Sequence, residues 1–190
     1  MIDSLMNNIE KTNVKILNEI GVVKNRYALI TLHRPSNVDD KSTLEGILEG
    51  LNAISKDIDL VFPLHPRTKS KIEEFELEAK LTENIRITEP LGYLDFLSLT
   101  KNAKIVITDS GGIQEETTAL GIPCLTLRNN TERPITVEEG TNKIIGNKQE
   151  RLIDEVKYIL VNENKKYQIP HFWDGKTALR IADIIEKQLS

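Results

Sequence analysis

The sequence lacks the features that mark secreted, membrane-spanning and nucleic-acid-binding proteins. It has one cysteine in 190 residues, which excludes an intrachain disulfide. Cys124 lies in the apolar run IPCLTL and is expected to be a small core residue. No stretch of about 18 apolar residues is present, and the start MIDSLMNNIEKTNV lacks the basic and apolar segments of a signal peptide. These absences predict a cytoplasmic protein that is not held in a membrane.

Charge of one sign is not concentrated anywhere along the chain. There are 25 basic and 29 acidic residues, a net charge of −4, and the densest charged stretch, KIEEFELEAK, is typical of a solvated helix. Because nucleic-acid binding depends on excess positive charge, this balance argues against a nucleic-acid partner. Any bound anion must be held by local groups. We expect neither a cofactor nor a metal site.

Apolar segments, by contrast, are plentiful and regularly placed. With 39% hydrophobic residues the chain can bury a core, and its length fits one domain over residues 1–190. Short apolar runs alternate with helical patterns, as in the stretch 42–55. Such alternation is typical of a parallel sheet covered by helices on both faces. We predict an α/β fold, a doubly wound parallel sheet of about six strands in the Rossmann order.

The expected elements follow from these patterns. Strands are predicted at 27–32, 58–64, 85–88, 104–108, 123–127 and 142–146. Helices are predicted at 1–22, 42–55, 67–81, 93–103, 113–120, 133–140, 150–162 and 174–189. Ligands of such sheets bind beyond the carboxyl ends of the strands, so the loops HRPSN, PLHPRTK, EPLGY, DSGG and RNNTERP should meet at one edge.

The turn Ser110-Gly111-Gly112 is the most informative of these loops. Glycines let the backbone approach a bulky anion, and the helix that follows directs unpaired N–H groups and a positive dipole end toward it. Ser110 adds a hydroxyl. The alternative is that Asp109 or Ser110 caps the helix and the glycines only form a tight turn.

Two carboxylates, Glu115 and Glu116, follow this turn. Adjacent helical residues point about 100° apart, so the pair is not expected to act as an acid/base dyad on one substrate atom. One of them could accept hydrogen bonds from sugar hydroxyls beside an anion. Alternatively, both are acidic residues that the helix dipole favours in the first turn.

Two histidines and three arginines also follow strands. His33 can donate to a phosphate or be a structural histidine, and Arg34 can pair with an anion. His65 has the same two interpretations, with the structural one favoured. Arg128 and Arg133 could place guanidinium groups on a diphosphate or form surface ion pairs. We assign no chemistry to His171, which lies in PHFWDG.

The stretches TLHRPSNVD, DSGGIQEETTALGIPCLTLR and NNTERPITVEEGTN resemble the C-terminal half of the non-hydrolysing UDP-N-acetylglucosamine 2-epimerases. The resemblance extends from MIDSLMNN through WDGKTALRIADII, essentially the whole chain. It implies one of the two Rossmann-like domains of the glycosyltransferase B-type fold, the domain that mainly holds UDP.

The resemblance also implies roles for individual residues in a UDP site that includes Arg34 and His65. It places His33, the candidate catalytic residue, beside the diphosphate. It assigns the phosphate to Ser110, Gly111, Gly112 and Arg133, the ribose hydroxyls to Glu116, and the uracil to Phe96 and to Leu91, the latter through its backbone.

Enzymes of this family invert C2 by eliminating UDP and adding it back, with carboxylates of the N-terminal domain moving the proton. The resemblance therefore implies an excised or naturally short C-terminal domain that is inactive alone. Its implied partners are UDP or UDP-GlcNAc and the missing N-terminal domain, within a homodimeric parent enzyme. The alternatives are a domain of a hydrolysing 2-epimerase or a UDP-sugar glycosyltransferase, and a non-catalytic UDP-binding module.

Overall fold

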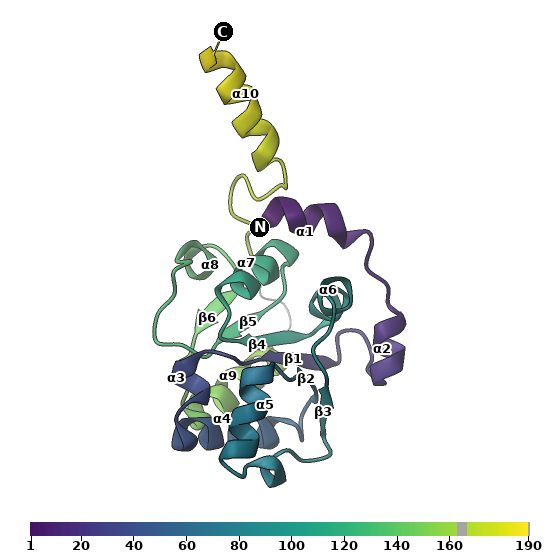
Figure 1. The fold of residues 1–190 in the computed structure, drawn as a ribbon, viewed down its shortest axis with the longest axis vertical. Coiled ribbons are helices and arrows are strands. Elements are labelled where there is room, and N and C mark those ends of the chain that lie inside the picture. The colour runs from purple at the N-terminus through teal and green to yellow at the C-terminus, as the bar shows by residue number, and fades with distance from the viewer. Residues whose placement is uncertain (163–166, 190) are drawn as a thin grey trace.

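The computed structural model describes residues 1–162 and 167–189 and contains one six-stranded sheet (Figure 1). Every strand pair is parallel, and the order β3-β2-β1-β4-β5-β6 confirms the predicted doubly wound topology. The strands are β1 (Tyr27–Thr31), β2 (Asp59–Pro63), β3 (Ile85–Thr88), β4 (Ile105–Thr108), β5 (Cys124–Thr126) and β6 (Asn142–Ile144).

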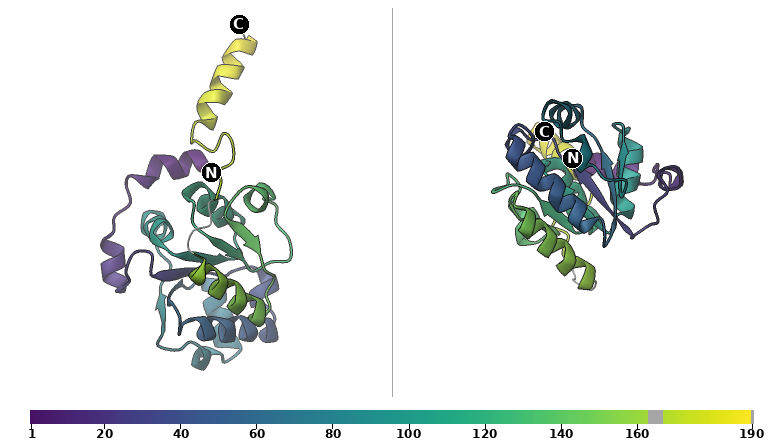
Figure 2. Two further views of the ribbon diagram at one scale, coloured as in Figure 1. Left: turned by 180° about the vertical axis from the view of Figure 1, so that it is seen from behind. Right: turned by 90° about the horizontal axis from the view of Figure 1, so that it is seen from below.

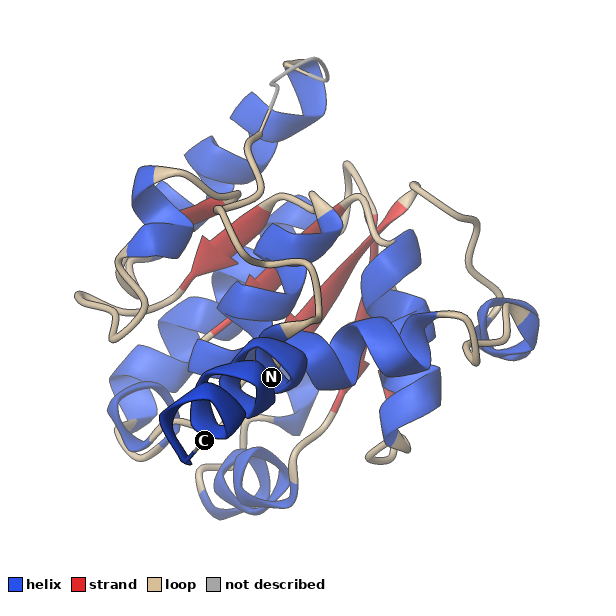
Figure 3. Ribbon diagram, turned by 90° about the horizontal axis from the view of Figure 1, so that it is seen from above, coloured by secondary structure: helices blue, strands red, loops and turns tan. Residues whose placement is uncertain are grey.

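Helices cover both faces of the sheet (Figures 2 and 3). Ala28 and Ile30 of β1 belong to a core cluster with α4 (Lys41–Ile54), α5 (Pro66–Glu74) and α9 (Gln149–Val161). Tyr27 and Leu29 point to the other face, into a cluster with α2 (Lys15–Ile20), α6 (Tyr93–Asn102) and α7 (Gly111–Leu120). Both sets are fully buried, which explains why β1 reads as a continuous apolar run. The short helices α3 (Pro35–Val38) and α8 (Ile135–Glu138) lie in loops after β1 and β5.

The single helix predicted over 1–22 is wrong, because this segment forms two helices. α1 (Ile2–Ile9) ends where the hydroxyl of Thr12 donates to the carbonyl of Ile9, at 2.8 Å. Asn13 then accepts a hydrogen bond from the N–H of Lys15, at 2.9 Å, and α2 begins there. Short polar side chains that bond their own backbone in this way interrupt helices.

The helix predicted over 67–81 is also wrong in its second half. α5 ends at Glu74, Glu76 adopts a positive φ of 57°, and a short 3-10 helix, η1 (Glu78–Lys80), follows. This turn sends Leu77 into the core, where its side chain is almost fully buried. Burial of one leucine thus outweighs the helical propensity of the charged residues around it.

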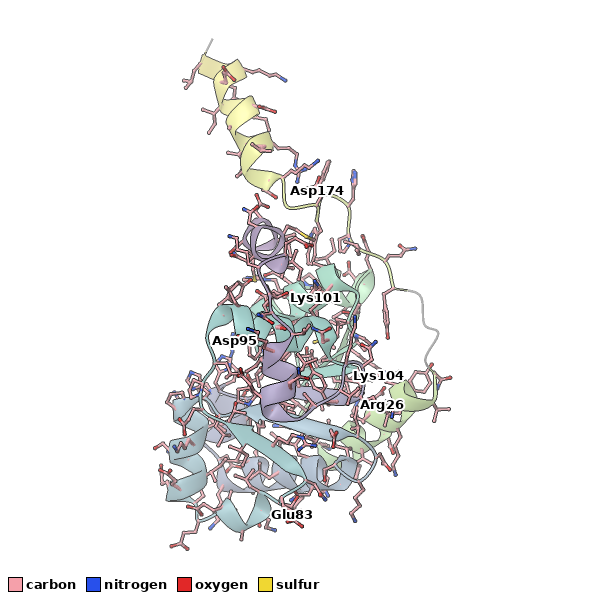
Figure 4. All side chains as sticks on the ribbon, turned by 90° about the vertical axis from the view of Figure 1, so that its right-hand side faces the viewer. Arg26, Glu83, Asp95, Lys101, Lys104 and Asp174 are labelled. Atoms are coloured by element: carbon pink, nitrogen blue, oxygen red, sulfur yellow. The ribbon has the colours of Figure 1, made fainter. Side chains whose placement is uncertain are left out.

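The last helix, α10 (Thr177–Leu189), begins three residues later than predicted. It extends away from the sheet beside α1, and none of its described residues is buried (Figures 1 and 4). Its start is tied to the body of the domain by a hydrogen bond of 2.8 Å from the N–H of Ala178 to Asp3. Within the described ranges, no helix has the length and apolar character needed to cross a membrane.

Candidate functional site

The loops after β1 and β4 leave the sheet side by side, at the point where the strand order reverses. β1 and β4 are neighbours although about 75 residues separate them, and Thr31 pairs with Thr108. The hydroxyls of these two threonines lie 2.6 Å apart. The loops after β1 and β4 therefore start together, at the position where doubly wound sheets bind ligands.

Asp109 joins these two loops. Its fully buried carboxylate accepts hydrogen bonds from the backbone N–H groups of His33 (3.0 Å) and Arg34 (2.9 Å) and from the amide of Asn37 (3.2 Å). Nδ1 of His33 lies 3.0 Å from the other carboxylate oxygen. Burial acts to raise the pKa of Asp109, but the hydrogen bonds from His33 and Arg34 outweigh it, so this pKa lies below its ordinary value. Asp109 thus anchors the His33 loop, and the alternative that it caps the following helix is wrong.

Ser110 occupies the N-cap position of α7 without capping it through its side chain. Its φ and ψ of −87° and 127° are extended, and its hydroxyl makes no cap hydrogen bond. A Cβ on Gly111 would lie 3.7 Å from Oε2 of Glu132, and one on Gly112 would lie 3.2 Å from Sδ of Met1. The turn therefore presents a free hydroxyl and the first N–H groups of a ten-residue helix, the groups that anions bind at helix N-termini.

Glu116 carries an acceptor without a donor. Its side chain is 6% exposed, and Oε1 accepts a hydrogen bond of 3.2 Å from the hydroxyl of Tyr93. Oε2 is buried and has no hydrogen-bond partner. Burial raises the pKa of Glu116, and burial beside this carboxylate raises the pKa of Tyr93 to about 12. An unsatisfied buried acceptor costs about 1–3 kcal/mol, which a ligand hydroxyl could recover.

His33 and His65 lie side by side, with ring centroids 5.3 Å apart. His65 is the N-cap of α5, and its Nδ1 accepts a hydrogen bond from the N–H of Arg67, at 3.2 Å. Burial and the neighbouring His33 lower the pKa of His65. His65 therefore has the structural role that the sequence favoured, and it also borders the side chain of His33.

The three arginines of the site differ in what already binds them. Both terminal nitrogens of Arg128 donate hydrogen bonds to the carboxylate of Glu132, at 2.8 and 2.7 Å. Arg128 thus forms the ion pair that the sequence offered as the alternative to a phosphate contact. Nε of Arg133 lies 3.1 Å from a carboxylate oxygen of Glu115, yet it makes no aligned hydrogen bond. Nε of Arg34 is buried and also lacks a hydrogen-bond partner. Arg34 and Arg133 thus keep donors for an anion, whereas Arg128 is engaged.

Comparison with known proteins agrees with this geometry. Residues 1–186 match the profile of the UDP-N-acetylglucosamine 2-epimerase family. The chain belongs to this family. It is 44% identical over 193 residues to the UDP-N-acetylglucosamine 2-epimerase of Methanocaldococcus jannaschii, covering 97% of this chain and 52% of that protein. The chain spans about half the length of the curated relatives it matches.

Two further relatives bear on the ligand. A crystal structure of the Methanocaldococcus jannaschii enzyme in complex with UDP-GlcNAc and UDP superimposes with a TM-score of 0.82 at 42% identity, covering 96% of this chain and 52% of that one. UDP-2,3-diacetamido-2,3-dideoxy-D-glucuronate 2-epimerase of Pseudomonas aeruginosa is 33% identical over 162 residues, which is 85% of this chain and 44% of that protein. Named members of the 2-epimerase family therefore act on more than one UDP-sugar.

In this 2-epimerase domain the residues expected near uracil lie just before and in the first turn of α6, the helix whose Tyr93 contacts Glu116 of α7. Leu91 and Phe96 are half-buried and pack against the core cluster beneath α6. They flank Tyr93, whose hydroxyl reaches Glu116. His171 stacks on Phe172, with ring centroids 3.9 Å apart, and no chemistry is assigned to it. In the described parts of the chain, no cluster of three or more His, Cys, Asp or Glu side chains could hold a metal.

Sequence reasoning missed Tyr93 and Asn37. Tyr93 stands in EPLGYLDF as an ordinary helix residue, and only the packing of α6 against α7 shows its contact with Glu116. Asn37 is almost fully buried and donates both to Asp109 and to the carbonyl of Leu127, at 2.8 Å. A short amide in the polar loop HRPSN was the available signal for it.

Proposed function

We propose that this chain is the UDP-binding half of a UDP-N-acetylglucosamine 2-epimerase, which interconverts UDP-GlcNAc and UDP-ManNAc by elimination and re-addition of UDP. The supporting observation is the pair of free groups on α7, the hydroxyl of Ser110 and Oε2 of Glu116. They are six positions apart, or about 9 Å along a helix, the scale of the separation between the diphosphate and the ribose hydroxyls of UDP. Family membership supports this nucleotide over other ligands of the same shape.

The proposed contribution of this half is to stabilise the leaving diphosphate. Ser110, the N–H groups of Gly111 and Gly112, and Arg133 surround the position of the phosphates. Asp109 engages Nδ1 of His33, so Nε2 remains to face the anion. Preorganised donors of this kind lower the barrier to departure of a charged group. In this proposal Glu116 accepts from the ribose hydroxyls, while Leu91 and Phe96 border the uracil.

The identity of the sugar is the finer part of the proposal. The Methanocaldococcus relatives carry the name UDP-N-acetylglucosamine 2-epimerase, whereas the Pseudomonas relative acts on a diacetamido glucuronate. A product assay on the whole enzyme, with both UDP-sugars, separates these substrates. The same assay distinguishes an epimerase from a hydrolysing enzyme or a glycosyltransferase. We further propose a cytoplasmic location and a homodimeric whole enzyme; the absence of a disulfide-forming cysteine pair supports the first, and only the resemblance supports the second.

The chain is expected to bind UDP with modest affinity, and loss of one phosphate contact should weaken binding measurably. Ser110→Ala and Arg133→Ala should each cost about 1–3 kcal/mol in UDP affinity, because a neutral and a charged hydrogen-bond donor are removed. Isothermal titration calorimetry with millimolar UDP measures both. Arg86→Ala, on the edge strand β3, is the matched control and should bind UDP like the parent. Absence of saturation by the parent chain, or unchanged affinity in both variants, would contradict the site.

Glu116 should make nucleoside binding dependent on pH. Uridine carries no phosphate, so its binding reports the ribose and uracil contacts without those of the diphosphate. Because a protonated carboxyl has lost acceptor strength, uridine affinity should fall as the pH drops through the raised pKa of Glu116. Glu116→Gln should bind about tenfold more weakly at neutral pH, with no fall in acid. The measurement is ligand-observed NMR from pH 4.5 to 7.5, with Glu115→Gln as the control; identical pH profiles for the parent and Glu116→Gln would refute the ribose contact.

A further inference from the structure

A ring of hydrogen bonds begins and ends on the backbone of Arg133. Its N–H donates to the hydroxyl of Thr131, at 2.9 Å, and that hydroxyl donates to Oε1 of Gln114, at 2.5 Å. The amide of Asn142 donates to the same Oε1, at 3.1 Å, and to the hydroxyl of Thr136, at 3.0 Å. The hydroxyl of Thr136 then donates to the carbonyl of Arg133, at 2.7 Å. Both backbone polar groups of Arg133 therefore bond threonine hydroxyls, and Gln114 of α7 and Asn142 of β6 connect the two threonines.

The part of the ring formed by Gln114, Thr136 and Asn142 is buried and tied to the sheet. Gln114 and Thr136 are fully buried, and Asn142 is 5% exposed. Oδ1 of Asn142 accepts a hydrogen bond of 2.6 Å from Thr126 on the adjacent strand. Both polar atoms of the Asn142 side chain are therefore hydrogen-bonded. The sheet thus fixes Asn142, which holds Thr136 directly and Thr131 through Gln114.

The arrangement is costly for a group that only fills the core. Nε2 of Gln114 is buried and has no hydrogen-bond partner. Burying an amide in this way is unfavourable unless all of its groups are paired, and aliphatic side chains would fill the same space without that cost. A network of this kind instead fixes one geometry, because moving any one of its members breaks a buried hydrogen bond.

We infer that Gln114, Thr131, Thr136 and Asn142 are positioning residues that set the place of Arg133 at the diphosphate. The inference rests on the proposed function, because it needs Arg133 to contact the ligand. Among the residues that the structure describes, only an ion pair with Glu115 and the backbone carbonyl of Glu132 engage the half-exposed guanidinium. The side chain is therefore loosely held, and the ring of hydrogen bonds fixes the position of the Arg133 backbone from which the guanidinium extends. A guanidinium placed about 1 Å away loses much of its interaction with a phosphate.

The sharpest test replaces the hydroxyl of Thr131, which lies in the loop and outside the proposed ligand contacts. Thr131→Val has nearly the same shape but cannot bridge Arg133 to Gln114, whereas Thr131→Ser keeps the hydroxyl. We expect Thr131→Val to weaken UDP about five- to tenfold, with Thr131→Ser within twofold of the parent. Uridine affinity, measured by ligand-observed NMR, should be unchanged in both, because the effect passes through the phosphate.

A double variant shows whether the effect passes through Arg133. In an Arg133→Ala background, Thr131→Val should cause no further loss of UDP affinity. Asn142→Val breaks the ring on its opposite side and introduces a side chain that suits a strand. Like Thr131→Val, it should weaken UDP binding and leave uridine affinity unchanged. Equal weakening of UDP and uridine, or full additivity in the double variant, would overturn the positioning role.

The outcomes also separate this inference from the function on which it rests. If Arg133→Ala binds UDP like the parent, Arg133 does not contact the phosphates, and both the proposed contact and the positioning role of the ring are contradicted. If Arg133→Ala weakens UDP while Thr131→Val and Asn142→Val do not, only the positioning role is overturned. Circular dichroism of each variant confirms that the fold is present before affinities are compared.

Discussion

Asp109→Asn is expected to lower the free energy of unfolding by about 2–4 kcal/mol, because the native site offers its side chain almost only donors. The carboxylate accepts from two backbone N–H groups and one amide and lies against Nδ1 of His33. An asparagine oxygen can take the place of Oδ2, but its NH2 group must then replace the oxygen that lies against Nδ1 of His33. The buried donors also lose the negative charge that they surround. Urea denaturation at neutral pH measures the loss.

The pH dependence of the same variant gives a second check. The pKa of Asp109 is depressed in the folded state, so its contribution to stability is present above the unfolded pKa of about 3.9 and is lost as the pH falls through the folded value. The stability difference between the parent and Asp109→Asn should therefore shrink in acid. Asp95 is an exposed aspartate on α6 (Figure 4). The control variant Asp95→Asn should change the free energy of unfolding by less than about 0.5 kcal/mol. A variant as stable as the parent at neutral pH would show that Asp109 does not anchor the loops.

The 190-residue chain alone is expected to give no measurable epimerisation of UDP-GlcNAc. C2 of an N-acetylhexosamine is a weak carbon acid, so proton transfer needs a positioned base within about 3 Å, and inversion needs a second group on the opposite face. Three acidic side chains around the α7 turn are already engaged: Asp109 with His33, Glu115 with Arg133 and Glu132 with Arg128. The free oxygen of Glu116 is assigned to the ribose in the proposed function, away from C2 of the sugar. His33 would face the diphosphate and could serve at most one face of the sugar.

Proton NMR in deuterated water tests this expectation directly. UDP-GlcNAc incubated with the chain should keep its C2 proton and give no UDP-ManNAc, while the M. jannaschii 2-epimerase, run in parallel, shows that the assay detects both. Deuterium at C2 would mean that the chain carries its own base, and the proposed division of labour between the two halves would then be wrong.

The sequence determined the fold class and predicts where a ligand site is expected. The alternation of apolar runs with helical patterns predicts all six strands, because a strand buried on both faces must be continuously apolar. Short parallel strands with helical crossovers then leave few topologies, of which the observed order is the commonest. The glycines after β4 and the polar loops after the other strands predict a ligand site at the carboxyl edge of the sheet, because loops there need no core-forming residues.

The helix errors arose where one residue outweighed a periodic pattern. Thr12 and Asn13 stop α1 through local hydrogen bonds, and the burial of Leu77 ends α5 early. Neither effect changes the spacing of apolar residues over a long window. Periodicity therefore located these segments but not their breaks.

Only the tertiary structure decided which polar group meets which. Asp109 bonds His33 across 76 positions of sequence, Tyr93 meets Glu116 across 23, and Asn142 meets Gln114 across 28. Each contact depends on two elements that the sheet order or helix packing places side by side. Hydrogen bonds act over about 3 Å, so the residue types along the chain fix which groups can bond, and the packing of α7 against its neighbours fixes which of them do.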